Sequence, residues 1–131
     1  MHPISEILCE VYSELFKQGQ VSFPLQEIHR NNLDAVVKTV NATYFGVERF
    51  LSPEEKAVAY LYLLVKDHAL VDGNKRMAIF WFSVYCRALQ LEPQYADFAL
   101  DQIAVAIEKS DSEKMDETMS AVRTILFRRI L

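Results

Sequence analysis

Cysteine, glycine and proline are scarce in this sequence. Its 131 residues include two cysteines, three glycines and four prolines. Collagen-like fibres and many disordered proteins are rich in glycine and proline, so the composition argues against both and favours an ordinary globular protein. Cys9 and Cys86 lie far apart among apolar residues, where a thiol usually behaves as a small hydrophobic side chain. We therefore expect a reducing, cytoplasmic environment.

An excess of positive charge and long apolar runs are also missing. The formal net charge is -4, and the late arginines Arg123, Arg128 and Arg129 are too few to form a nucleic-acid footprint. No uninterrupted apolar run reaches the roughly 18 residues that span a bilayer, and the N-terminus lacks the basic and apolar segments of a signal peptide. We expect no direct nucleic-acid binding, no membrane insertion and no secretion.

The chain has the length of one domain. About half of its 131 residues are hydrophobic, which suffices for one core but not for two independent ones. No internal repeat, low-complexity tract or flexible linker divides the sequence. We expect a single domain over residues 1–131, which can also be a piece of a longer protein.

The spacing of apolar residues predicts an all-α fold. Helices are expected at 3–17, 24–41, 53–67, 74–89 and 98–109, followed by one that Ser112 caps and that runs into the C-terminal Arg-Arg-Ile-Leu. Pro24 suits the first turn of the second helix. Ser52 is expected to cap the third, with Pro53 at its first position and Glu55 closing a capping box.

Two segments depart from the amphipathic pattern. Residues 42–51 surround Gly46 with β-branched and aromatic side chains, which predicts a short extended segment or hairpin, here called the flap. Tyr44, Phe45 and Arg49 could contact a substrate there, but a packed aromatic underside is the favoured interpretation. Helix 74–89 is apolar nearly all round, which predicts a central, buried element whose aromatic residues Phe80, Trp81, Phe82 and Tyr85 belong to the core.

The loop between the third and fourth helices carries the candidate chemistry. A helix that begins near Asn74 offers unpaired N–H groups and the positive end of its dipole to an anion, and Gly73 permits close approach. Arg76 can bind phosphate oxygens bidentately, whereas Lys75 acts as a point charge. Gly73, Asn74, Lys75 and Arg76 are therefore predicted to bind the phosphates of a nucleotide such as ATP.

Two further residues complete a possible transferase. The carboxylate of Asp72 suits Mg²⁺ that is shared with nucleotide phosphates and water. His68 can take a proton from an attacking hydroxyl at neutral pH. Each motif residue also has a structural interpretation: His68 as a helix cap or core group, residues 72–74 as an ordinary turn with a helix cap, and Lys75 and Arg76 as a solvated pair.

Residues 68–76, His-Ala-Leu-Val-Asp-Gly-Asn-Lys-Arg, resemble the death-on-curing (Doc) form of the Fic signature, H-x-F-x-[D/N]-[A/G]-N-K-R. The positions that match are His68, Asp72, Gly73, Asn74, Lys75 and Arg76. The resemblance implies a Fic-fold helical bundle and a transferase that moves phosphate from ATP or another nucleotide to a hydroxyl of a target protein. It assigns His68 as the base, Asp72 to Mg²⁺ and the rest to phosphate, and it implies a toxin with an antitoxin or other regulatory partner.

The sequence departs from related signatures at three positions. Leu70 stands where the family usually has Phe, which keeps an apolar anchor of smaller volume. Adenylylating members resemble H-P-F-x-[D/E]-G-N-G-R-x-x-R, whereas this chain has Lys75 for the second Gly and Ile79 for the last Arg. The resemblance therefore implies phosphorylation. Transfer of AMP or another nucleotidyl group remains an alternative, as does a non-catalytic interaction domain.

Overall fold

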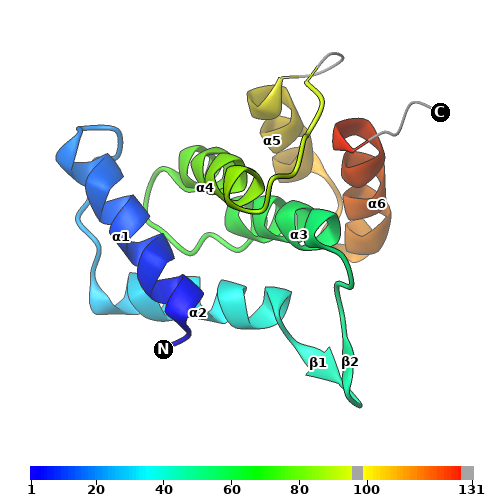
Figure 1. Ribbon diagram of the computed structural model, residues 1–131. Helices are drawn as coiled ribbons and strands as arrows, with labels where there is room; N and C mark the ends of the chain where they lie inside the picture. The colour runs from blue at the N-terminus through cyan, green and yellow to red at the C-terminus, as the bar shows by residue number, and fades with distance from the viewer. Residues whose placement is uncertain (96–98, 128–131) are drawn as a thin grey trace.

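Six α-helices and one short hairpin form the part of the chain that the computed structural model describes, residues 1–95 and 99–127 (Figure 1). The elements in chain order are α1 (Pro3–Lys17), α2 (Glu27–Val40), β1 (Thr43–Tyr44), β2 (Val47–Glu48), α3 (Pro53–Lys66), α4 (Asn74–Ala88), α5 (Leu100–Lys109), a 3₁₀ turn (Ser112–Lys114) and α6 (Met115–Leu126). The prediction of an all-α fold with a hairpin before the motif is confirmed.

Helix α3 is the central element. Every residue from 57 to 65 is buried, and α2, α4, α5 and α6 all pack against this helix (Figure 1). The prediction that helix 74–89 is central is wrong, because one face of α4 stays open and leaves Phe80 45% exposed. Trp81 and Phe82 are buried as expected. The uninterrupted apolar run at 57–65 is the sequence feature that marks the true centre. None of the described helices has the length and apolarity needed to cross a bilayer.

Capping contacts decide where the helices begin. Ser52 Oγ accepts the Glu55 N–H at 3.1 Å as predicted, but the Glu55 carboxylate accepts from Leu51 N–H at 3.2 Å rather than from Ser52. Helix α2 begins at Glu27, three residues later than predicted, because Gln26 N–H donates to His29 Nδ1 at 3.2 Å and fixes the helix start after Pro24.

The end of the chain also differs from prediction. Asp111, not Ser112, provides the cap before the last helix, since its carboxylate accepts the Glu113 N–H at 2.9 Å. A 3₁₀ turn then leads into α6. The predicted start of the fifth helix at residue 98 and the predicted extension over 128–131 lie outside the described residues.

The flap is a two-stranded antiparallel hairpin with Thr43 opposite Glu48. Phe45 and Gly46 form its turn with φ of 53° and 79°, the positive values of a tight type I′ connection. The expected aromatic underside is wrong for Tyr44 and Phe45, which are both exposed, because the short strands project away from the helices (Figure 1). Of the three aromatic residues in the flap, Phe50, just after the hairpin, is the one that is buried.

Asp34 ties α1 to α2. Its carboxylate accepts from Ser5 Oγ at 2.6 Å and from His2 N–H at 3.1 Å, and it forms an ion pair with Lys38 at 2.9 Å. The hydrogen bond from Ser5, together with that from Lys38, lowers the pKa of Asp34 well below its usual value. The contact fixes α1, and with α1 the following loop, which borders the candidate site described below.

Replacement of Asp34 by Asn is expected to lower the free energy of unfolding by about 1–2 kcal/mol at pH 7, because charge-assisted hydrogen bonds are lost. The folded-state pKa of Asp34 is depressed, so its contribution is complete above the unfolded-state pKa of about 3.9 and declines as the pH falls below that value. Urea denaturation from pH 7 to pH 3 measures this.

The exposed Glu10 on α1 offers the control, Glu10→Gln. The difference between wild type and Asp34→Asn should shrink towards acid pH, while the control stays close to wild type. If Asp34→Asn lowers the free energy of unfolding equally at pH 3 and pH 7, the stabilisation does not come from the charge of the Asp34 carboxylate.

Candidate functional site

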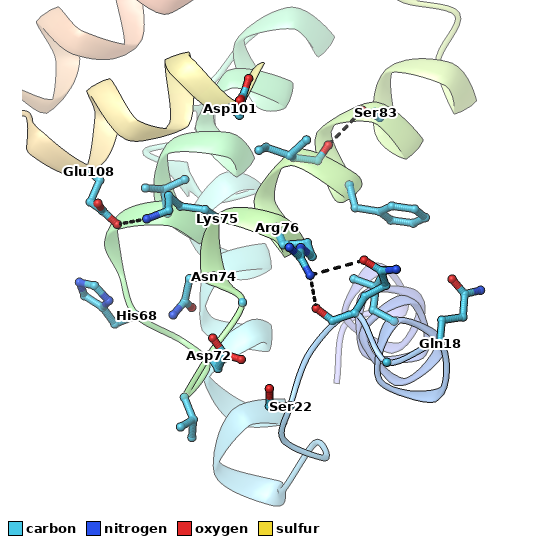
Figure 2. A pocket seen from close by; sticks show the side chains of 18 residues that line it. Gln18, Ser22, His68, Asp72, Asn74, Lys75, Arg76, Ser83, Asp101 and Glu108 are labelled. Carbon is cyan, nitrogen blue, oxygen red and sulfur yellow. Dashed lines mark hydrogen bonds and ion pairs between the residues drawn. The ribbon is translucent and has the colours of Figure 1, made fainter. Parts of the chain in front are cut away.

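The motif residues meet in an open cleft at the N-terminal end of α4 (Figure 2). The loop from α3 to α4 forms one wall, the segment after α1 forms a second, and α5 contributes side chains from above. The cleft has a volume of about 990 Å³. All six motif residues that match the signature line it: His68, Asp72, Gly73, Asn74, Lys75 and Arg76.

The start of α4 offers free hydrogen-bond donors. Gly73 is the N-cap residue with φ of 76°, and its carbonyl accepts the first helical bond from Met77 N–H at 2.8 Å. Among the hydrogen bonds of the described residues, none uses the N–H groups of Asn74, Lys75 or Arg76. These donors and the positive end of the helix dipole can together bind an anion.

Asn74 organises the loop with its side chain. Its Oδ1 accepts from Leu70 N–H and its Nδ2 donates to Leu70 carbonyl oxygen, both at 3.1 Å. Asn32 of α2 donates to the Ala69 carbonyl at 3.1 Å, and both Ala69 and Leu70 are buried. The side-chain amide of Asn74 is therefore engaged within the loop, which leaves its backbone N–H as its contribution to an anion site. Leu70 occupies the apolar anchor position that the signature assigns to Phe.

Lys75 is paired with an acid that the sequence did not reveal. Its Nζ lies 2.8 Å from Oε2 of Glu108 on α5, and Figure 2 shows this contact next to His68. The hydrogen bond from Lys75 lowers the pKa of the Glu108 carboxylate, and the nearby charge of His68 adds a smaller effect. Nothing local could have identified Glu108, because the pair is separated by 33 residues and depends on how α5 packs.

Arg76 points to the opposite wall of the cleft. Its Nη1 donates to the Gln20 carbonyl at 2.5 Å and to Gln20 Oε1 at 3.4 Å (Figure 2). Both acceptors are neutral, so these hydrogen bonds do not compensate the positive charge of the guanidinium. The two bonds use only one of its nitrogen atoms, and a guanidinium has five N–H donors. The other nitrogen atoms can donate to an anion at the helix start.

Asp72 and His68 complete the cleft. Both side chains are exposed, and the contacts of the described residues give neither an ion pair nor a hydrogen bond. His68 has φ of 48°, a left-handed conformation that a non-glycine residue adopts only at a cost of roughly 1–3 kcal/mol. An exposed His68 without such a bond matches neither the helix cap nor the core group considered from sequence.

The fit of a metal ion can be tested on Asp72. Within residues 1–95 and 99–127, no three His, Cys, Asp or Glu side chains gather closely enough to hold an ion by themselves. Asp72 offers one carboxylate at the edge of an anion site, and Mg²⁺ usually takes one or two carboxylates plus phosphates and water. The residues therefore fit an ion held jointly with a nucleotide.

The residues that match known proteins include most of this site. A family model described as the Fic/DOC family matches residues 3–86, well over half of the chain. The protein named Toxin Doc from Mycolicibacterium smegmatis is 42% identical over 72 residues. This match covers 53% of the chain and 53% of the relative, so it spans about half of either protein. No solved structure matches the chain significantly. Glu108 lies beyond the residues that the family model matches.

Both the backbone conformation at position 73 and the packing of Val21 against it require glycine. A Cβ atom built on it would lie 2.5 Å from Cγ1 of the buried Val21, in addition to the unfavourable φ of 76°. Gly73→Ala is expected to lower the free energy of unfolding by about 1–3 kcal/mol, as measured by thermal or urea denaturation.

Gly46 in the flap provides a matched control. Its φ is 79°, but a Cβ there would meet nothing within 4 Å. Gly46→Ala should therefore show the cost of the backbone conformation alone, about 1 kcal/mol. Equal losses for the two variants would remove the Val21 contact from the explanation.

Proposed function

Because the chain belongs to the Fic/DOC family, we propose that it transfers the γ-phosphate of ATP or a related nucleotide to a hydroxyl group of a target protein. Members of this family generally transfer phosphate or nucleotide groups to proteins. The observation that carries the proposal is one cleft in which an exposed His68 and Asp72 border a helix start with free N–H donors.

The nucleotide phosphates bind at the start of α4. They accept hydrogen bonds from the N–H groups of Asn74 and Lys75, and Arg76 adds a charge-assisted contact from the opposite wall. Lys75 contributes its charge by exchanging the carboxylate of Glu108 for a phosphate oxygen. Asp72 would hold Mg²⁺ beside the phosphates, where the ion supplies neutralisation of the charge that develops during transfer.

His68 acts as the general base. The oxygen of the target hydroxyl attacks the γ-phosphorus, the bond from that phosphorus to the oxygen bridging it to the β-phosphate breaks, and the hydroxyl proton moves to the imidazole. ADP leaves with the electron pair of the broken bond. The exposed position of His68 at the edge of the cleft suits a residue that must meet a protein substrate.

Two positions favour phosphate over nucleotide transfer. Lys75 stands where adenylylating members have Gly, and its side chain lies in the cleft wall, paired with Glu108. Ile79, where those members have a second Arg, lines the cleft with an apolar side chain. A nucleotide held in the adenylylating orientation would therefore meet an obstructing lysine and lack one phosphate ligand.

The similarity to a protein named Toxin Doc supports a biological role as a toxin. We propose that the chain is the toxin of a toxin–antitoxin pair, with a separate antitoxin as its regulatory partner. The sequence has no [S/T]-x-x-x-E-[G/N] string, the inhibitory sequence of many Fic enzymes, which leaves control to a separate partner or to a further part of a longer chain.

Labelled ATP tests the reaction directly. The purified protein, Mg²⁺ and cell lysate are incubated with ATP labelled at the γ- or the α-phosphate. A γ-label on a target protein supports phosphorylation. An α-label supports nucleotidyl transfer instead, and no label with either substrate argues for a non-catalytic interaction domain.

His68→Ala is expected to reduce γ-label transfer by about a hundredfold or more, within the range of general-base catalysis, and to leave ATP affinity nearly unchanged. Transfer rate, ATP affinity and Tm are measured on the same preparation. A variant with wild-type Tm and wild-type transfer would exclude His68 from the mechanism.

Arg76→Ala is expected to weaken binding of Mg²⁺–ATP by roughly tenfold, as calorimetric titration can measure, because a charge-assisted phosphate contact is lost. Arg87 lies in the last turn of the same helix, is exposed and does not line the cleft. Arg87→Ala is therefore the matched control and should bind ATP like wild type. Equal affinities for the two variants would place the phosphates elsewhere.

A further inference from the structure

An aromatic side chain lies open in the phosphate cleft. Phe80 is 45% exposed although the flanking Trp81 is buried, and its ring lines the same cleft as Arg76. The two residues are four positions apart in α4, so they occupy the same face of the helix, about 6 Å apart along its axis. Trp81 packs into the core, whereas Ile79 and Phe80 line the cleft, so the Phe80 ring is open to a ligand that enters it.

The surroundings of Phe80 suit a flat ligand with polar edges. Leu15 and Ile79 line the same cleft with apolar side chains, and Gln18 and Ser83 add neutral polar groups. Gln18 donates from Nε2 to Glu14 Oε1 at 3.2 Å, which leaves its own Oε1 as an acceptor. Figure 2 shows Gln18, Ser83 and Arg76 on one side of the cleft and His68 on the other. A ligand that extends from Phe80 to His68 must therefore cross the phosphate donors.

We propose that Phe80 is the stacking platform for the nucleobase of the bound nucleotide. This inference rests on the proposed function and adds to it the position and direction of the nucleotide. The base lies on the Phe80 ring with its polar edge towards Gln18, the phosphates follow along Arg76 to the start of α4, and the terminal phosphate ends near His68. Asn74 and Phe80 are six residues apart, about 9 Å along the helix, so the ribose lies between the base and the phosphate donors.

A ligand that has phosphates but no nucleobase distinguishes binding of the base at Phe80 from binding of the phosphates at the start of α4. Calorimetric titrations use Mg²⁺–ATP and Mg²⁺–tripolyphosphate against wild type, Phe80→Ala and Phe80→Trp. Loss of one base–aromatic stack is expected to weaken ATP binding by roughly tenfold in Phe80→Ala. Binding of tripolyphosphate should not change in this variant, and Phe80→Trp should keep the affinity for ATP.

Leu89→Ala is the matched control, because Leu89 ends the same helix, is 46% exposed and does not line the cleft. It should bind both ligands like wild type, and Tm values identify any variant that is unfolded. The fluorescence of the new tryptophan in Phe80→Trp, measured as a difference from wild type, should change with ATP but not with tripolyphosphate.

The outcomes separate this inference from the proposed function. If Phe80→Ala binds ATP as tightly as wild type, or loses both ligands equally, Phe80 is no base platform, whereas the phosphate site remains supported. If the wild-type protein binds neither ATP nor tripolyphosphate, the proposed function fails and this inference fails with it.

Discussion

Nine consecutive apolar residues in α3, from 57 to 65, must be removed from water, and four other helices pack around them to do so. The placement of these helices brings distant segments to one end of α4. The segment after α1 supplies Gln20 and Val21, and α5 supplies Glu108. The candidate site is therefore a product of how the helices surround α3, although its signature is a continuous stretch of sequence.

Sequence reasoning succeeded where the controlling interactions are local. The cap at Ser52 and the interruption at residues 68–73 were predicted because the residues that cause them are neighbours in the chain. The same reasoning could not identify Glu108 or Gln20 as contacts of the motif, since these contacts join residues 33 and 56 positions apart. The exposure of Phe80 is unpredictable for a related reason: an apolar helix indicates burial, but its sequence does not indicate which face a neighbouring helix leaves uncovered.

The electrostatics of the cleft differ from those of the whole chain. A net charge of -4 argues against binding a long polyanion, but it does not prevent a small anion from binding at a helix start. The two basic motif residues are also unequal. Lys75 is neutralised by a carboxylate, whereas the hydrogen bonds of Arg76 within the described residues go to the neutral oxygens of Gln20. Arg76 and the N-terminus of α4 therefore attract phosphate in the unliganded protein. The charge of Lys75 becomes available when Glu108 is displaced.

The contact between Val21 and Gly73 links the motif to a residue 52 positions earlier. The Doc form of the signature allows alanine as well as glycine at position 73. In this fold, however, an alanine needs both a different backbone angle and a smaller neighbour. Positions 21 and 73 are thus expected to vary together during evolution. Relatives that carry alanine after the motif aspartate should have a smaller residue where this chain has Val21. Transfer of this chain's motif to such a relative would introduce the glycine without the valine that packs against it.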